Sequence, residues 1–301
     1  MHLAAERHPH RESRLLLNML TPRAPLAPST AASPPWPGAI LALDGVTHAY
    51  RGPSRDVFAV NDVSLAIGPV EFVAVVGPSG CGKSTLLRIA SGLVQPTAGS
   101  AVFGTDKLAG PRPEIGMIFQ DAVLLPWFTV LENVVLPQRI ARRSLPAART
   151  QAREMLHAVG LGGFEDGYPD NLSGGMRQRA AIVRALLAEP RLLLMDEPFG
   201  ALDALTRETM NLQLSGIAED SGCAVLLITH SIPEAVLLAD RVLVMTPRPG
   251  RIADDIGIDL PRPRSARTMA DPAFTTLCDR IRRHFHAEGS NAYRGAERHE
   301  H

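Results

Sequence analysis

Short apolar runs alternate with stretches of helical periodicity through the middle of the chain. This alternation is typical of a parallel sheet whose strands are joined by crossover helices, so we predict an α/β fold. The predicted strands are residues 71–76, 115–119, 191–195, 224–229 and 242–245. The predicted helices between them are residues 84–92, 203–218 and 232–238.

A longer region, residues 129–190, is mostly helical in its pattern. We predict that Pro137, Pro146 and a glycine-rich stretch near residue 160 break it into separate helices. The position of this region between two predicted strands implies a helical subdomain, at about 121–190, inserted into a larger α/β domain that spans 39–262.

The two ends of the chain differ in composition from the middle. Residues 1–38 are rich in Pro, Ala, His and Arg, and we expect a disordered extension. Alternatively, the natural start lies downstream, for example at Met19. Residues 263–301 are expected to form an Arg-rich C-terminal tail with an amphipathic stretch near 273–287.

Basic and acidic residues balance at 31 each, so the formal net charge is zero. Because proteins that hold nucleic acid by bulk charge carry an excess of basic residues, we expect no nucleic-acid partner. Three cysteines without a close pair exclude a disulfide scaffold and fit a reducing compartment. No apolar run approaches the roughly 20 residues that span a bilayer, and residues 15–20 are too few for a signal peptide. We therefore expect a cytoplasmic protein that reaches a membrane only through a partner.

A glycine-rich loop with the sequence GPSGCGKST joins the predicted strand 71–76 to the predicted helix that follows. It fits the phosphate-binding pattern G-x-x-x-x-G-K-[ST]. The glycines let backbone N–H groups surround the phosphates, the helix adds its positive end, and Lys83 adds a compact cation. The Ser84 hydroxyl would bind Mg²⁺. The predicted nucleotide-binding residues are Gly77, Pro78, Ser79, Gly80, Cys81, Gly82, Lys83, Ser84 and Thr85.

Two carboxylates, Asp196 and Glu197, follow the apolar run LLLM. This position places them at the carboxyl edge of the predicted sheet, where open α/β folds bind their ligands. We expect Asp196 to hold Mg²⁺ through water and Glu197 to polarise the attacking water. Solvated acids at a strand end are the alternative, and the phosphate loop favours the functional interpretation.

The segment LSGGM at 172–176, followed by RQR, resembles the signature motif of the ATP-binding cassette (ABC) ATPases. Ser173, Gly174 and Gly175 stand at a predicted helix start, which is an anion site in its own right. The resemblance covers about residues 39–260. It implies a P-loop NTPase core with a RecA-like mixed sheet, an inserted helical subdomain and an antiparallel β portion. Met176 stands where many members of the family have glutamine.

The resemblance also assigns residues outside the phosphate loop. Gln120 resembles the glutamine that contacts Mg²⁺ and reports to the transporter partner, and Asp203 resembles the aspartate at the dimer interface. His230 resembles the switch histidine that contacts the γ-phosphate, so it joins Glu197 and Lys83 as a catalytic candidate. Tyr50 resembles the aromatic residue that stacks on adenine, with His48 and Phe58 as competitors.

Segments 119–127, 201–207 and 229–252 resemble the subfamily that energises importers of nitrate, aliphatic sulfonates and taurine. Importers of bicarbonate and of pyrimidine or thiamine precursors are the alternative, as is a cassette ATPase without a permease. The resemblance implies an ATPase that uses ATP and Mg²⁺ and pairs head to tail with a second copy of itself. It further implies integral membrane permease subunits, a periplasmic or lipid-anchored solute-binding protein, and a peripheral location on the cytoplasmic side of the inner membrane.

Only two of the 31 basic residues are lysine, Lys83 and Lys107. If arginine serves wherever charge alone matters, the remaining lysines mark positions that need a compact ammonium group. Lys83 in the phosphate loop is such a position, whereas we expect Lys107 to be a surface residue. Cys81 lies in the same loop, where it is either a thiol protected by bound nucleotide or an inert small residue that fills space.

Overall fold

The computed structural model describes residues 36–52, 55–200, 207, 210, 211, 216 and 222–296. Most of the extension predicted at 1–38 and most of the helix predicted at 203–218, including Asp203, lie outside the described residues. Within this part of the chain the elements are β1 (Leu41–Tyr50), β2 (Val57–Ile67), β3 (Phe72–Val76), α2 (Lys83–Ala90), β4 (Ala98–Phe103), β5 (Asp106–Lys107), β6 (Ile115–Ile118), α3 (Val130–Ile140), α4 (Leu145–Ala158), a 3₁₀ turn (Pro169–Asn171), α5 (Gly174–Leu187), β7 (Leu192–Asp196), β8 (Ala224–Thr229), α7 (Ile232–Leu238), β9 (Arg241–Met245), β10 (Ile252–Gly257), α8 (Ala266–Met269) and α9 (Pro272–Ala296).

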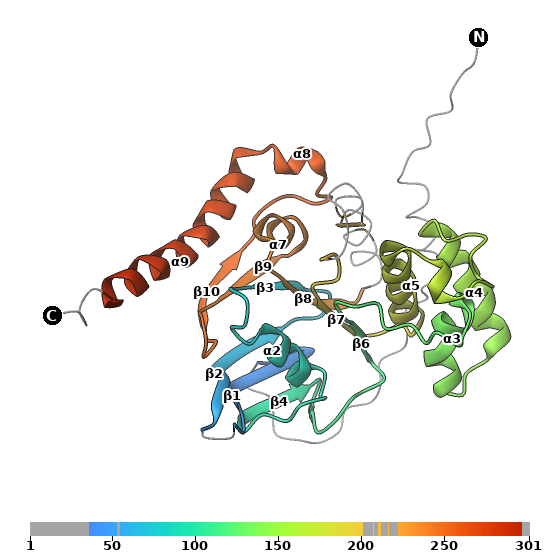
Figure 1. Ribbon diagram of the computed structural model, residues 1–301, viewed down its shortest axis with the longest axis horizontal. Helices are drawn as coiled ribbons and strands as arrows, with labels where there is room; N and C mark the ends of the chain where they lie inside the picture. Colours follow the sequence, from blue (N-terminus) through green and yellow to red (C-terminus); the bar gives the residue numbers. More distant parts are fainter. Residues whose placement is uncertain are drawn as a thin grey trace, which may run out of the picture.

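The described strands form two sheets. One sheet has six strands in the order β10-β9-β3-β8-β7-β6, and it is mixed because β10 runs antiparallel to β9 while the other pairs are parallel. The other sheet has four strands in the order β2-β1-β4-β5, all antiparallel. Figure 1 shows the two sheets one above the other, with α2 between them and the helices α3–α5 to one side. The predicted mixed core, antiparallel portion and helical insertion are therefore confirmed.

The strands predicted from apolar runs appear as β3, β6, β7, β8 and β9. Both faces of the central strand β3 are buried, because alternate residues belong to two separate hydrophobic clusters. Phe72 and Val76 belong to the cluster that includes residues of α3, α5, α7 and α9, whereas Val73 and Val75 belong to the cluster that includes residues of α2 and the antiparallel sheet. A parallel strand that is covered on both faces consists of consecutive apolar residues, which is why the apolar run predicted β3 correctly.

The three helices that follow β6 and precede β7 in the sequence, α3, α4 and α5, pack against one another. Pro146 lies in the first turn of α4, where a proline is tolerated because that N–H has no helical partner. The break predicted at Pro137 is wrong, since α3 continues through it to Ile140. The turn beyond the proline keeps its bonds, and the Ala141 N–H donates to the carbonyl of Pro137.

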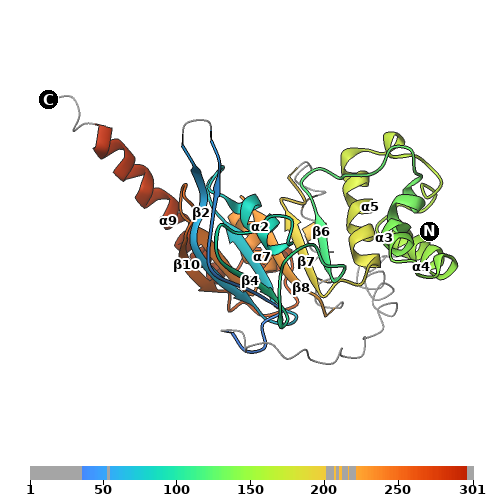
Figure 2. The ribbon, with the colours of Figure 1, turned by 90° about the horizontal axis from the view of Figure 1, so that it is seen from below.

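The region beyond residue 262 packs onto the domain. The predicted amphipathic stretch is confirmed as α9, whose Phe274, Cys278 and Ile281 join the larger hydrophobic cluster beside α7. In both ribbon views the far end of α9 extends away from the sheets (Figures 1 and 2). Within the part of the chain that the structure describes, no helix combines the length and the apolar character that a membrane span requires.

Candidate functional site

The phosphate loop leaves the end of β3 and curls around the side chain of Lys83. The lysine is buried, with 6% of its surface exposed, and its Nζ donates to the carbonyls of Gly77 and Pro78 at 2.8 and 2.9 Å. The ammonium group is therefore held inside the curve of the loop by two backbone carbonyls. Such an arrangement pre-positions a positive charge for an anion.

Two glycines of the loop adopt a backbone conformation that L side chains rarely take. Gly80 has φ of 75° with open space around its missing side chain, and Gly82 has φ of 110°. A Cβ at Gly82 would lie 2.4 Å from the carbonyl oxygen of Ala59, so any larger residue there would displace β2. Because Gly82 is also the N-cap of α2, the turn brings the amino end of that helix to the loop, where its unpaired N–H groups can meet phosphate oxygens.

Ser84 and Asp196 meet across the edge of the sheet. The Ser84 hydroxyl lies on the first turn of α2 and donates to Oδ1 of Asp196, at the end of β7, over 3.2 Å. Burial raises the pKa of Asp196, partly offset by this hydrogen bond. A hydroxyl and a carboxylate are the oxygen ligands that Mg²⁺ prefers, so the donor set fits this ion.

Glu197 and His230 lie next to each other at the same sheet edge. Nδ1 of His230, just after β8, is 3.1 Å from Oε2 of Glu197, just after β7. Glu197 has φ of 44°, an uncommon conformation for a side chain other than glycine. Its backbone N–H donates to the carbonyl of Ile228, and this bond fixes the turn that directs the carboxylate toward the histidine.

Tyr50, His48 and Phe58 lie near the loop on the antiparallel sheet. The Tyr50 hydroxyl is 3.2 Å from the hydroxyl of Thr85, and its ring meets that of His48 edge-on. Both Tyr50 and Phe58 are exposed, whereas His48 is largely buried and contacts the carbonyl of Gln95 through Nδ1. Of the three candidates, Tyr50 is hydrogen-bonded to a residue of the phosphate-binding segment, Thr85.

Gln120 is exposed and lies two residues beyond the end of β6. The backbone beside it is fixed by Gln178, a buried residue of α5 whose side-chain amide donates to the carbonyl of Phe119 over 3.2 Å. Sequence reasoning did not assign a role to Gln178. The available signal was its place in the RQR segment next to the signature, on a helix face that otherwise packs in the core.

The signature residues lie away from the phosphate loop. Ser173 is the N-cap of α5, and its hydroxyl accepts from the N–H of Met176 over 3.3 Å. Both ribbon views place β6 between α5 and α2, the helix that follows the phosphate loop (Figures 1 and 2). The helix α5, whose amino end carries the exposed Ser173 and Gly174, thus lies on the other side of β6 from α2. Asp203 lies outside the described residues.

Cys81 fills the space under the phosphate loop. Its side chain is 1% exposed, and a Cβ on Gly77 would lie 2.9 Å from its sulfur. Burial raises the pKa of the Cys81 thiol, although Lys83 acts in the opposite direction from 4.0 Å. The geometry is that of a small residue that supports the loop.

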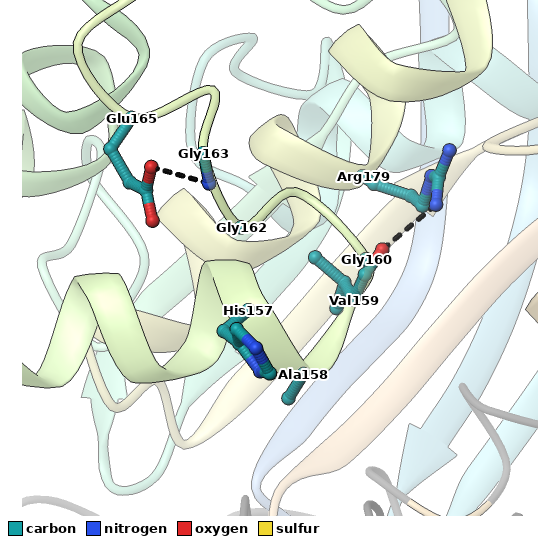
Figure 3. Close-up of a pocket in the computed structure, with 8 residues that line it drawn as sticks. All are labelled: His157, Ala158, Val159, Gly160, Gly162, Gly163, Glu165 and Arg179. Atoms are coloured by element: carbon teal, nitrogen blue, oxygen red, sulfur yellow. Dashed lines mark hydrogen bonds between the residues drawn. The ribbon is translucent and has the colours of Figure 1, made fainter.

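A cavity of about 470 Å³ lies in the helical region, between the end of α4 and α5 (Figure 3). It is lined mainly by the glycine-rich turn after His157 and by Arg179, which donates to the carbonyl of Val159 over 2.8 Å. Figure 3 also shows the Gly163 N–H donating to Glu165. None of the residues that we predicted for the site lines this cavity, so it carries no part of the phosphate chemistry.

Comparison with known proteins gives consistent results. A family model described as ABC transporter matches residues 60–200. The ATP-binding protein BAB2_1147 of Brucella abortus (strain 2308) is 48% identical over 241 residues, which are 80% of this chain and 91% of that protein. The taurine import ATP-binding protein TauB of Yersinia pestis bv. Antiqua is 46% identical over 220 residues, 73% of this chain and 85% of that one. The solved structure of the ATP-binding cassette MJ0796, a dimer in a post-hydrolysis state with ADP and phosphate, is 33% identical with a TM-score of 0.66, over 73% of this chain and 99% of that one.

Proposed function

The chain belongs to the ABC transporter family of ATP-binding proteins, and we propose that two copies of it energise an importer for a small solute such as taurine, an aliphatic sulfonate or nitrate. The protein is an ATPase. The observation that carries the proposal is the meeting of three groups at one sheet edge: the loop around Lys83, the Ser84–Asp196 pair and the Glu197–His230 pair.

The proposed site binds ATP by its phosphates. The N–H groups of the loop and of the first turn of α2 would receive the β- and γ-phosphates, and Lys83 would exchange its carbonyl partners for phosphate oxygens. Ser84, Asp196 and Gln120 would hold Mg²⁺, which would supply positive charge to offset that of the phosphates. Tyr50 offers a flat, exposed ring for the adenine.

Hydrolysis transfers the γ-phosphoryl group to water. Glu197 would orient the water and accept its proton as the new P–O bond forms, and the bond to the ADP oxygen breaks. His230, held 3.1 Å from Glu197, would keep that carboxylate in place and contact the γ-phosphate. Phosphoryl transfer depends on where the charged groups of the site lie. The strained turn at Glu197 would therefore serve the reaction by holding the carboxylate in position.

The signature residues need a second copy to act on nucleotide. The exposed start of α5, a helix that β6 separates from α2, supports a head-to-tail dimer, in which Ser173 and Gly175 of each chain would contact ATP bound by the other. The cassette MJ0796 is described as a dimer, which adds support. Asp203 would lie at this interface. ATP would close the dimer, and hydrolysis would remove the γ-phosphate contact and reopen it.

The partners of the dimer would be integral membrane permease subunits. Phe119, Val123 and Trp127 expose 38%, 54% and 67% of their surface in the segment after β6, beside Gln120. Exposed apolar side chains next to a residue that senses nucleotide suit a docking surface for a permease. The protein would then sit peripherally on the cytoplasmic side of the inner membrane, and a solute-binding protein on the other side would deliver the solute.

The decisive experiment is reconstitution of this chain with the permease encoded beside its gene. We expect ATPase activity to rise when the solute-binding protein is loaded with taurine or an aliphatic sulfonate. If only bicarbonate or only a pyrimidine precursor raised the ATPase activity, that compound would be the solute in place of taurine or a sulfonate. Absence of any stable complex with a membrane protein would overturn the transport proposal.

A further inference from the structure

Glu234 is a buried carboxylate beside the Glu197–His230 pair, and the reaction described above gives it no task. It lies on the first turn of α7, and 6% of its surface is exposed. Burying an acidic side chain to this extent is costly unless specific partners compensate. The partners of Glu234 therefore indicate what it does.

One carboxylate oxygen of Glu234 is used to fix the loop that carries His230. Oε2 accepts a hydrogen bond from the hydroxyl of Thr229, and that hydroxyl accepts from the N–H of Ser231 over 3.0 Å. The Ser231 hydroxyl in turn accepts from the N–H of Glu234 over 3.4 Å. Thr229 is thus bonded to the Glu234 side chain directly, and Ser231 is linked to that side chain through Thr229 and bonded to the Glu234 backbone.

This arrangement differs from an ordinary helix cap. In a capping box the third helical residue, here Glu234, would accept directly from the N–H of the N-cap Ser231. Instead, that N–H donates to Thr229, and the Glu234 carboxylate is displaced past the cap toward the catalytic groups. A residue that served only to cap α7 would not need this displacement.

The second carboxylate oxygen has no hydrogen-bond partner among the residues that the structure describes. Oε1 is buried without a hydrogen bond, and Glu234 lines a cavity of about 10 Å³ together with Glu197, His230 and Arg207. That volume is about what a single water molecule requires, and the walls offer the polar partners that a buried water needs. An orphaned carboxylate oxygen in a polar cavity of this size points to a bound water.

We propose that Glu234 is a positioning residue for ATP hydrolysis: it fixes the chain on both sides of His230 and binds one water molecule behind the Glu197–His230 pair. The inference rests on the roles proposed for Glu197 and His230. Burial raises the pKa of Glu234, although the Thr229 hydrogen bond and the charge of Arg207 oppose this shift. A glutamine at this position keeps the size of the side chain and an oxygen acceptor for the Thr229 hydroxyl, so it is a close substitute for the native side chain.

The test compares Glu234→Ala with Glu234→Gln. We expect Glu234→Ala to lower kcat at least about 10-fold with little change in KM for ATP, because the loop around Lys83 is intact while His230 is misplaced. We expect Glu234→Gln to keep kcat within about 3-fold of the wild-type value, since it restores the Thr229 bond. Glu154→Gln, an exposed change in α4, is the matched control. Equal loss in the Ala and Gln variants, or a change in KM alone, would overturn the proposal.

A second readout does not depend on catalysis. In protein with labelled histidine, the His230 resonance is identified by its loss in His230→Ala, and we expect it to shift in Glu234→Ala and in Thr229→Val but not in Glu154→Gln. An unchanged His230 resonance in folded Glu234→Ala and Thr229→Val would overturn the positioning role. If Glu234→Ala does not fold, Thr229→Val removes the same hydrogen bond with similar shape and supplies the result. Because the resonance needs no turnover, it tests Glu234 even if the roles proposed for Glu197 and His230 in hydrolysis fail.

Discussion

Ser84 and Asp196 are hydrogen-bonded over 3.2 Å although 112 positions separate them in the sequence. The contact joins the first turn of α2 to the end of β7, so it spans the edge of the sheet where the nucleotide is proposed to bind.

Replacement of Asp196 by asparagine keeps a side chain of the same shape but removes the charge. We expect about 100-fold lower Mg²⁺-dependent ATPase activity and weaker Mg²⁺ dependence of nucleotide binding. Measuring nucleotide affinity with Mg²⁺ and with EDTA checks this, and identical Mg²⁺ dependence in both proteins would contradict it.

Glu197→Gln should bind ATP and fail to hydrolyse it. The amide keeps the size of the side chain and its contact with His230 but cannot accept the proton of water. We expect at least about a 100-fold loss of kcat and a stable ATP-bound dimer, seen by size-exclusion chromatography with and without ATP. Hydrolysis by Glu197→Gln at the wild-type rate would refute the role proposed for this residue.

Lys83→Arg should lose most ATPase activity, whereas Lys107→Arg should not change it. The Lys83 ammonium is enclosed by the loop and donates to two carbonyls less than 3 Å away, and a planar guanidinium is too wide for that place. Lys107 is an exposed residue of β5. The two substitutions are chemically identical, so Lys107→Arg controls for the exchange itself. Steady-state ATPase rates measure both, and equal activity of the two variants would show that charge alone suffices at residue 83.

Cys81 should react slowly with alkylating reagents, and faster as pH rises. Only the thiolate reacts, and burial raises the pKa of this thiol, so the reactive fraction near neutral pH is small. After Cys81 is alkylated, we expect that the loop cannot keep its curve around Lys83 and that ATP binding is lost. Bound ATP should slow the modification further. Mass spectrometry of residue 81 against time, with Cys81→Ala as the unreactive control, measures this. Fast labelling at pH 7 that leaves ATP binding intact would disprove it.

Asp254→Asn should loosen the C-terminal helix. Asp254 on β10 lies 3.3 Å from Arg280 and 3.0 Å from His284, both on α9. Burial raises the pKa of Asp254, but the Asp255 N–H and Arg280 outweigh it and hold the pKa below its usual value of 3.8. A depressed pKa means that the stabilisation is complete above that value and is lost as the pH falls through the lower folded-state pKa.

For pairs this exposed we expect the loss to be about 0.5 kcal/mol, with faster amide exchange confined to α9 and its contacts. Amide hydrogen exchange at pH 7 measures the effect. Arg282→Gln is the control, because Arg282 pairs with Asp279 within the helix itself. Uniform faster exchange throughout the domain would instead indicate a general loss of stability.

The sequence predicted the sheet core and the phosphate loop because both depend on local composition. Buried parallel strands need continuous apolar runs, and a loop that encloses phosphate needs glycines with positive φ, such as Gly82. Buried polar residues are different, because their partners come from distant segments. The Gln178 side chain donates to the carbonyl of Phe119, 59 positions away, and nothing in its sequence neighbourhood indicates this.

The C-terminal region shows the same limit in another way. Its many arginines suggest a solvated tail, yet Arg264 is buried and donates to carbonyls at the end of α7, including that of Val236. An arginine in this region stays on the surface unless a helix end with free carbonyls lies next to it, in which case it donates hydrogen bonds to them. That information is absent from the composition of the segment.

The parallel registers of the central sheet place the chemical groups of the site with respect to one another. Val76, before the phosphate loop, pairs with Thr229, before His230, and Asp196 pairs with Ile228. A shift of β8 by one residue would therefore move His230 away from both neighbours at once and turn its apolar side chains to the opposite face. Insertions between the strands leave this alignment unchanged, so the helical region can be exchanged or enlarged, and with it the proposed docking surface, while the proposed hydrolytic centre stays the same.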